Sequence, residues 1–325
     1  MIKLGTVGTS RITEGFLSGA ALTGEFEHIA VYSRSLDMGK AFAERFRAKE
    51  VYTDLVEMAK SGIDAVYIAS PNVFHVKQSR VFLENGIHVI CEKPIATNAL
   101  EYMELKKFAD SRGLVYMEAI IPRHISGYGA VKQALHKIGK ISMARIDFCQ
   151  RSSRLDDFLQ GKHVNIFDMS LHAGTLMDLG VYCVYGAVDL LGIPDKIEAE
   201  ATLLDNGADG SGAAIFTYPD FTAVLSYSKT GDTACGSEII GQNGTLKIKK
   251  ISQYTDVTLV KDGIETKITG SLTKAELMSD EAKRFADYIN APELFADDYR
   301  TASLLCENVH KLMDKIKLSA GLKYM

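Results

Sequence analysis

The stretch IKLGTVGTSRIT, residues 2–13, decides how the first part of the chain is predicted to fold. Six residues of β-strand character lead to Gly8, and a helix-length stretch begins at Arg11. Against the dinucleotide-binding pattern GxGxxG, the three positions are Gly8, Ser10 and Thr13, of which only the first is glycine. Backbone N–H groups at a helix start can still hold a pyrophosphate, and the two hydroxyls can add donors. A strand–turn–helix without a ligand stays open as the alternative.

The alternation of strand and helix continues from this stretch to residue 119. Strands are predicted at 2–7, 28–33, 65–69, 88–91 and 114–118, and helices at 11–22, 36–47, 53–60, 73–85 and 98–112. Strands separated by helices of this length imply βαβ crossovers, and hence a doubly wound parallel sheet of the Rossmann type. The strands are apolar without alternation, as expected where helices bury both faces of a sheet.

The pattern changes near Pro122, where longer β segments separated by turn pairs predict a mostly antiparallel open sheet. These segments lie at 140–150, 196–205, 211–218, 221–229, 235–241, 244–249 and 255–268, with helices at 125–137, 173–191, 274–289 and 295–318. We therefore predict two domains. Residues 1–120 form an NAD(P)-binding Rossmann domain, and residues 121–325 form an α+β domain for substrate binding and oligomerisation.

Composition excludes several classes of partner. The net charge is 37 − 41 = −4, so no excess of basic residues favours nucleic acid or an anionic membrane. The N-terminus lacks the apolar region of a signal peptide, and the apolar stretch 176–192 is interrupted by Asp178 and Asp189. Five scattered cysteines without a CxxC pair fit reduced thiols, so we expect a cytoplasmic protein. Eight histidines show no HExxH spacing, and we expect no metal.

The end of the second predicted strand indicates which cofactor binds. NAD-binding proteins usually carry an acidic residue there for the ribose hydroxyls, whereas this chain has Ser33 and Arg34. A hydroxyl followed by a guanidinium can bind a 2′-phosphate through charge-assisted hydrogen bonds. The sequence therefore predicts NADP, with NAD possible; a surface arginine at a turn is the alternative interpretation.

Two further turns follow strands of the same predicted sheet. They read Ser70-Pro71-Asn72 and Cys91-Glu92-Lys93-Pro94, and ligands of open α/β sheets sit beyond the carboxyl ends of the strands. Pro94 restricts the backbone of Lys93, through a cis bond in one interpretation, and makes the turn rigid. A lysine beside a cationic nicotinamide has its pKa lowered and can donate to a substrate hydroxyl.

The predicted helix within HAGTLMDLGVYCVYGAV, residues 172–188, carries Asp178 and Tyr182 four residues apart, on one face. Gly174 and Gly180 cost helix stability, so we expect a close approach of another group to the backbone there. From spacing alone, a solvated aspartate and a core tyrosine remain the alternative.

Taken in order, the phosphate turn and three motifs resemble the Gfo/Idh/MocA oxidoreductases over nearly the whole chain. The motifs are PNxxH from Pro71, EKP from Glu92 and DxGxY from Asp178. They look most like the branch that contains dihydrodiol dehydrogenases, xylose dehydrogenases and glucose–fructose oxidoreductase. There a tyrosine stands where inositol dehydrogenases have histidine.

This resemblance implies roles for individual residues. Lys93 is the lysine of EKP, Asp178 orients substrate or base, and Tyr182 is the acid/base. The implied cofactor contacts are Gly8, Thr9, Ser10, Arg11, Ile12, Ser33, Arg34, Ser70, Pro71, Asn72, His75, Glu92 and Lys93. Arg123 matches a substrate arginine of the family, and the polar loop residues His163 and Asn165 are further candidates. Ser10, Thr13 and His172-Ala173-Gly174 depart from the family's glycines, so cofactor pose and pocket shape are expected to differ.

These residues predict an NADP-dependent oxidoreductase that transfers hydride between nicotinamide and a secondary alcohol or carbonyl of a sugar, polyol or diol. Tyrosine, with an ordinary pKa of about 10, needs a nearby ammonium to act as a base near pH 7. Two other functions compete. One is an NAD-dependent glycosidase acting by transient oxidation and elimination, and the other is a cofactor-binding sensor without turnover.

The second predicted domain also indicates self-association. An open sheet leaves one large face uncovered, and an uncovered apolar face often marks an oligomer interface. In TAVLSYS, residues 222–228, the residues Ala223, Leu225 and Tyr227 share one face that would suit it. Members of the resembled family commonly dimerise this way, so we expect a homodimer through the C-terminal sheet.

Overall fold

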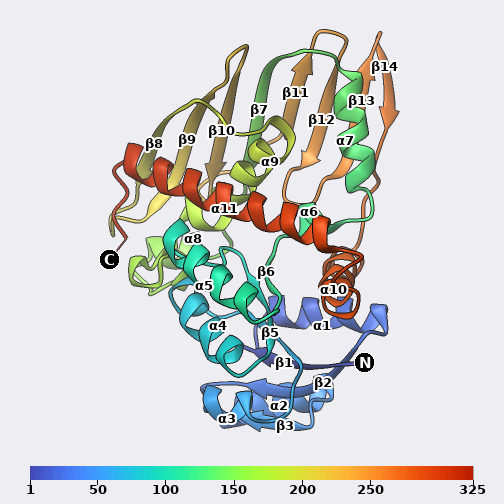
Figure 1. Ribbon diagram of the computed structural model, residues 1–325. Coiled ribbons are helices and arrows are strands. Elements are labelled where there is room, and N and C mark those ends of the chain that lie inside the picture. Colours follow the sequence, from blue (N-terminus) through green and yellow to red (C-terminus); the bar gives the residue numbers. More distant parts are fainter. Residues whose placement is uncertain (325) are drawn as a thin grey trace. The chain divides into compact units, whose positions relative to one another are not determined.

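In the computed structural model, which describes residues 1–324, β1 (Ile2–Val7) lies inside a six-stranded parallel sheet (Figure 1). The strand order is β3-β2-β1-β4-β5-β6, so the order reverses between β1 and β4. The other strands are β2 (Phe26–Tyr32), β3 (Glu50–Tyr52), β4 (Ala65–Ile68), β5 (His88–Glu92) and β6 (Tyr116–Ala119). The predicted Rossmann-type sheet is confirmed. The edge strand β3 was not predicted, because three partly exposed residues leave no apolar run.

Helices connect these strands close to the predicted positions. They are α1 (Arg11–Thr23), α2 (Leu36–Phe46), α3 (Leu55–Ala59), α4 (His75–Glu84), α5 (Ala99–Ser111) and the short α6 (Ile121–His124). Helix α5 has Asn98 as its N-cap. The Asn98 side chain accepts a hydrogen bond from Glu101 N at 3.0 Å, while the Thr97 hydroxyl donates to the Glu101 carboxylate at 2.6 Å. Side-chain caps of this kind satisfy N–H groups at a helix start.

A helix from late in the chain belongs to the same compact unit, which comprises residues 1–124 and 273–304. Helix α10 (Lys274–Asn290) starts with a capping box between Thr273 and Glu276 and packs against α1. A side-chain carbon on Gly19 of α1 would lie 2.6 Å from the Met278 backbone, so glycine permits this close contact. The division at residue 120 placed α10 in the second domain, because chain order cannot reveal that a helix returns.

The second unit comprises residues 125–272 and the residues from Leu305 onward. Its eight-stranded sheet has the order β14-β13-β12-β11-β7-β10-β9-β8, and every neighbouring pair is antiparallel except β7–β10. The strands are β7 (Ile141–Cys149), β8 (Lys196–Leu203), β9 (Asp209–Thr217), β10 (Thr222–Ser228), β11 (Ser237–Gly241), β12 (Gly244–Lys250), β13 (Thr255–Lys261) and β14 (Ile264–Lys267). The predicted large, mostly antiparallel sheet is therefore confirmed.

Helices cover one face of this second sheet. α9 (Val181–Leu191) packs close to β7, since a side-chain carbon on its Gly186 would lie 3.7 Å from Ile146. From the end of α11 (Ala296–Ser319), the Ser319 hydroxyl accepts from Ala199 N of β8 at 2.8 Å. Helices α7 (Tyr128–Lys137) and α8 (Leu155–Leu159) complete the α-helices of the described second unit.

The covered face differs from the one expected for β10. Ala223, Leu225 and Tyr227 are at most 1% exposed, and β10 packs against α9 and the turn before it, where the Tyr227 ring lies next to Gly180. The residues that alternate with them, such as Val224 and Ser226, are partly exposed on the opposite face. The strand is two-faced as predicted, but its apolar face is buried inside the unit. The face expected at an oligomer interface was therefore the wrong one.

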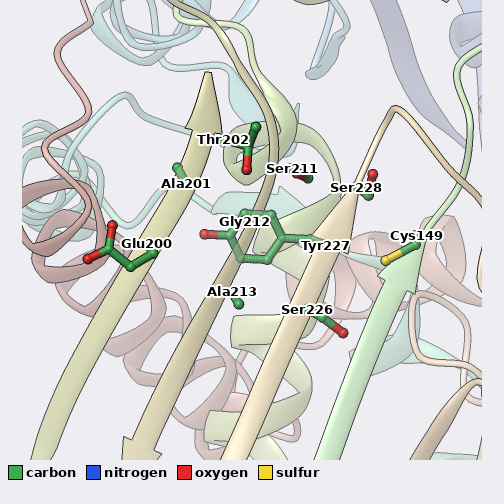
Figure 2. A pocket seen from close by; sticks show the side chains of 10 residues that line it. All are labelled: Cys149, Glu200, Ala201, Thr202, Ser211, Gly212, Ala213, Ser226, Tyr227 and Ser228. Carbon is green, nitrogen blue, oxygen red and sulfur yellow. The ribbon is translucent and has the colours of Figure 1, made fainter. Parts of the chain in front are cut away.

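On the opposite face a hollow of about 530 Å³ lies over β7, β8, β9 and β10 (Figure 2). The hollow is bordered by Cys149, Glu200, Ala201, Thr202, Ser211, Gly212, Ala213, Ser226, Tyr227 and Ser228, of which Tyr227 has its ring on the helix-covered side. The Cys149 thiol donates to the Asp147 carboxylate at 3.3 Å, and burial with this acid raises the pKa of Cys149 to about 12. The thiol therefore stays protonated and is not a nucleophile at neutral pH.

One segment of the described chain, Met169–Leu191, is long and apolar enough to pass a length-and-composition test for a membrane span. Its mean hydropathy is 1.2, and 78% of the window is buried within the fold. Core helices pass the same test, and the packing of α9 on β7 makes this segment a core helix of the second unit.

Candidate functional site

The turn after β1 is shaped for a close approach to β4. Gly8 has φ +106°, and a side-chain carbon on it would lie 2.8 Å from the Ala69 carbonyl oxygen. A larger residue would therefore be strained and would fill the cradle at the point where the strand order reverses. Ser10 is the N-cap of α1 and is exposed, whereas Thr13 is fully buried with its hydroxyl 3.4 Å from that of Ser10. The Thr13 hydroxyl packs next to Gly8 inside the turn. The backbone N–H groups at the start of α1 can bind a pyrophosphate.

The end of β2 presents the residues expected at the adenosine ribose. Arg34 is exposed, while Ser33 is 8% exposed and its hydroxyl accepts from Ser35 N at 3.3 Å. Ser35 in turn caps α2 by accepting from Met38 N at 3.4 Å. Ser33 therefore fixes the turn from which the Arg34 guanidinium projects.

The turns after β4 and β5 are joined by His75, which is 1% exposed. Its Nε2 lies 2.7 Å from the Ser70 carbonyl oxygen, and its Nδ1 lies 2.8 Å from that of Pro94. Burial lowers the pKa of His75. Both ring nitrogens face backbone carbonyls inside the unit, and a neutral ring donates a hydrogen bond to one of them, so His75 packs between the two turns. Its assignment as a cofactor contact stays a prediction.

Within the first unit, the Lys93 turn is anchored to the sheet through Glu92. The Lys93–Pro94 peptide bond is cis, as one interpretation of the sequence expected. The Tyr67 hydroxyl donates to the Glu92 carboxylate at 2.5 Å, and the Tyr67 ring stacks on Phe16 with centroids 3.9 Å apart. Burial raises the pKa of Glu92, and the neighbouring Lys93 acts in the opposite direction. Glu92 is thus tied to the sheet core while the partly exposed Lys93 follows it at the carboxyl edge of the sheet.

In the second unit, Asp178 and Tyr182 lie on either side of a change in helix type. Asp178 belongs to a π-helical turn, Leu176–Gly180, and Tyr182 lies in the first turn of α9. Single π-helical turns are frequent at functional sites. Both side chains are partly exposed, and the Tyr182 ring meets Phe148 edge-on with centroids 5.7 Å apart. Neither is the fully solvated or fully buried residue of the alternative interpretation.

Both glycines of this helix region allow the close approach that the sequence suggested. Gly174 has φ +139°, and a side-chain carbon there would lie 2.0 Å from an Asp209 carboxylate oxygen. A carbon on Gly180 would lie 3.2 Å from the Tyr227 ring. The carboxylate of Asp209 accepts from Leu176 N at 2.6 Å, and burial raises its pKa to about 6. Asp209 therefore ties the first turn of the Asp178 helix to β9.

Motif reasoning did not find two residues that touch this region. Asp209 was not among the predicted site residues, and it is the first residue of β9. Lys229 directly follows β10, and its ammonium forms an ion pair with the Asp178 carboxylate. A lysine at the end of a strand gives no sequence signal of its own, because the pairing depends on the register of β9 and β10.

Arg123 lies in α6 and has an internal partner. Its side chain is 8% exposed and pairs with Asp298 of the same unit at 2.6 Å, and its role as a substrate contact stays a prediction. His163 is 70% exposed, with Nε2 2.8 Å from the Asp168 carboxylate. Asn165 starts a short 3-10 turn, Asn165–Phe167, and is exposed. These two loop residues stay predictions as substrate contacts.

A Rossmann-type sheet with a phosphate cradle and a rigid lysine turn, followed by an open-sheet unit, defines a nicotinamide-dependent oxidoreductase. A sequence model described as an oxidoreductase family with an NAD-binding Rossmann fold matches residues 2–120. Another, described as the GFO/IDH/MocA C-terminal domain, matches residues 128–247. The chain therefore belongs to the GFO/IDH/MocA oxidoreductase family, as the motifs indicated.

Individual relatives agree with this membership. The chain is 37% identical over 326 residues to the scyllo-inositol 2-dehydrogenase (NADP(+)) IolU of Bacillus subtilis. This match covers 100% of the present chain and 98% of the relative. It is 29% identical to trans-1,2-dihydrobenzene-1,2-diol dehydrogenase of Mus musculus, covering 79% and 78% of the two chains. The protein is thus an NAD(P)-dependent dehydrogenase or reductase of the sugar, polyol and diol class that acts on CH–OH groups.

Solved structures share the fold over nearly the whole chain. KijD10, a 3-ketoreductase from Actinomadura kijaniata in complex with NADP and TDP-benzene, has a TM-score of 0.84 at 23% identity. Levoglucosan dehydrogenase in complex with NADH has a TM-score of 0.85 at 16% identity. Each likeness covers 98% of this chain and 97% of the other.

Proposed function

We propose that the protein is an NADP-dependent dehydrogenase that exchanges hydride between nicotinamide and a ring carbon of a cyclic polyol or sugar. The observation that carries the cofactor preference is the exposed Arg34, two residues after the end of β2. The substrate class is supported by the relative that matches the whole chain, whose name specifies scyllo-inositol and NADP. The more distant diol dehydrogenase also acts on a ring that bears neighbouring hydroxyls, as its name states.

Arg34 supports NADP on electrostatic grounds. A guanidinium provides a planar fork of donors that matches a phosphate, and an exposed one is free to turn toward a ligand. At the same place an acidic side chain would repel the 2′-phosphate and favour the ribose hydroxyls of NAD. The Ser33 hydroxyl stabilises the turn by accepting a hydrogen bond from Ser35 N, and its own O–H can donate to the phosphate beside Arg34.

Replacing Arg34 by alanine is expected to raise the KM for NADP roughly 10- to 100-fold, as loss of a charge-assisted hydrogen bond implies. The KM for NAD should change little, because NAD lacks the 2′-phosphate. Initial-rate kinetics with both cofactors measure the effect. Arg80→Ala, which removes another exposed arginine of the same unit, is the matched control. An unchanged KM for NADP, or a clear wild-type preference for NAD, would contradict the cofactor assignment.

The catalytic proposal assigns one role to each of three residues. The Gly8 turn and Arg34 would hold NADP, which would supply the hydride acceptor for the carbinol carbon. Tyr182 takes the proton from the substrate hydroxyl, and Asp178 accepts a hydrogen bond that orients the substrate. Lys93 supplies an ammonium that stabilises the Tyr182 phenolate and the developing alkoxide. The hydrogen bond from Tyr67 to Glu92 and the packing of His75 against Pro94 support the role proposed for Lys93, because they fix the turn that carries it. Stabilisation of a phenolate or an alkoxide by an ammonium depends on its precise placement.

A turnover screen tests the function and separates it from its rivals. The purified protein is supplied with NADP⁺ and single cyclic polyols, sugars or dihydrodiols, and absorbance is followed at 340 nm. Net NADPH formation is expected with at least one neutral substrate that bears a secondary ring hydroxyl. Glycoside cleavage without net NADPH would favour the glycosidase mechanism, and cofactor binding without turnover on any substrate would favour the sensor.

We further propose that the protein forms a homodimer through the open face of the second sheet. That face carries exposed apolar side chains, including Met143 at 39% and Ile215 at 43% exposure. The hollow of Figure 2 lies over strands of the same sheet. Replacing Ile215 by lysine should shift the mass measured by light scattering from dimer to monomer, because the charge would be buried between copies. Lys107→Ala, which changes an exposed lysine of the other unit, is the control. A wild-type monomer at micromolar concentration would contradict the proposal.

A further inference from the structure

Asp178 has a partner that the family's motif does not include. The Lys229 ammonium pairs with Asp178 Oδ2, and the two side chains differ sharply in burial. Lys229 is 5% exposed, whereas Asp178 is 40% exposed. One end of the ion pair is therefore inside the protein, and the carboxylate end can meet a ligand.

Lys229 is fixed by its surroundings before it meets Asp178. Its backbone N–H donates to the Gly210 carbonyl at 2.9 Å, and its carbonyl accepts from Ser152 N at 2.9 Å. The ammonium lies 5.9 Å from the centroid of the fully buried Phe167 ring, and its charge also acts on the buried Asp209. Burying an ammonium costs free energy unless the charge is paired. The Lys229 ammonium therefore holds the Asp178 carboxylate next to it.

The helix that carries Asp178 is fixed from the same side. Asp209 accepts from Leu176 N at 2.6 Å, two residues before Asp178. The Thr175 hydroxyl donates to the carbonyls of Asp209 and Gly210, at 2.7 and 3.0 Å. Asp209, at the start of β9, thus fixes the backbone of the Asp178 turn, and Lys229, after β10, fixes the Asp178 side chain.

We propose that Lys229 is a positioning residue of the dehydrogenase, which acts through Asp178 by keeping its carboxylate charged and pointed at the substrate. This inference rests on the proposed role of Asp178 in orienting the substrate. It also sharpens that role. A carboxylate paired with a buried ammonium accepts hydrogen bonds and does not take up the substrate proton, which leaves proton transfer to Tyr182. The substrate side of this pair therefore suits hydroxyl donors, as in a neutral polyol.

Lys229→Met removes the charge and keeps most of the side-chain length. With the polyol that gives the highest turnover, kcat is expected to fall roughly 10- to 100-fold, the effect of a displaced orienting group. The KM for NADP should stay at the wild-type value, because the cofactor cradle belongs to the other unit. Lys229→Arg should restore a substantial part of kcat, since it returns a cation to the pair. Lys247→Met, which breaks an exposed ion pair of the same sheet, should leave both constants unchanged.

A double variant separates action through Asp178 from a general structural effect. If Lys229 acts through Asp178, adding Lys229→Met to Asp178→Asn should cost no further kcat. This comparison stays decisive if Lys229→Met alone is unstable, because the double variant carries no unpaired charge. Two results would overturn the proposal: wild-type kcat in Lys229→Met, or losses that multiply in the double variant. Wild-type kcat in Asp178→Asn would instead overturn the proposed role of Asp178, and this inference with it.

Discussion

Replacing Tyr182 by phenylalanine is expected to lower kcat by roughly 10²- to 10⁴-fold, the usual contribution of a positioned general acid–base group. The ring and its edge-on contact with Phe148 remain, so the variant removes only the hydroxyl. Affinity for NADPH, measured by fluorescence titration, should stay unchanged. The loss should therefore appear in kcat at saturating cofactor and substrate.

A second tyrosine of the same unit provides the control. The Tyr218 hydroxyl donates to the Gly192 carbonyl at 3.1 Å, and its ring stacks on Phe221. Tyr218→Phe should cost about 1 kcal/mol of stability, as for one lost hydrogen bond, and leave kcat unchanged. Near-wild-type turnover in Tyr182→Phe would remove Tyr182 from the mechanism.

Replacing Lys93 by methionine is expected to lower kcat by roughly 10²- to 10³-fold, as when one donor that stabilises a developing oxyanion is removed. The ammonium should matter more in the transition state than in the substrate complex, so the KM for the polyol should change less than kcat. Lys93→Arg should not restore activity fully, because a planar guanidinium cannot occupy the place of a compact ammonium.

An exposed lysine of the same unit, changed in Lys107→Met, controls for the loss of one positive charge. Thermal unfolding should be compared for both variants, since His75 and Glu92 hold the turn independently of the Lys93 side chain. Equal turnover of Lys93→Met and the control would show that the EKP lysine is not required here.

Much of the fold follows from local patterns. The apolar strands and the helix lengths between them predicted the parallel sheet, and the cradle at Gly8 follows from the first turn. The short strand β3 and the return of α10 to the first unit could not be predicted, because both depend on tertiary packing. The face of β10 was misjudged for a related reason. Alternation in a strand separates two faces but does not show which face the chain's own helices cover.

The site likewise contains residues that sequence motifs predict and residues that only tertiary packing reveals. Lys93, Asp178 and Tyr182 stand in motifs, so the sequence could nominate them. Lys229 and Asp209 reach the Asp178 turn only through the pairing of β9 with β10, and no spacing along the chain reveals that. Arg123 matched a family pattern, yet its burial against Asp298 shows an internal ion pair. Motifs predict the candidate reacting groups, whereas the residues that orient these groups are identified only from the packing of the folded chain.

The central claim is that Lys93 and Tyr182 act as one unit on the same substrate. Its most direct test is the kcat of the double variant Lys93→Met/Tyr182→Phe, measured by NADPH formation beside both single variants. Groups that work as a unit give strongly non-additive losses. The double variant should therefore be about as slow as the slower single variant. Losses that multiply, so that the double variant falls by the product of the two single effects, would contradict the account.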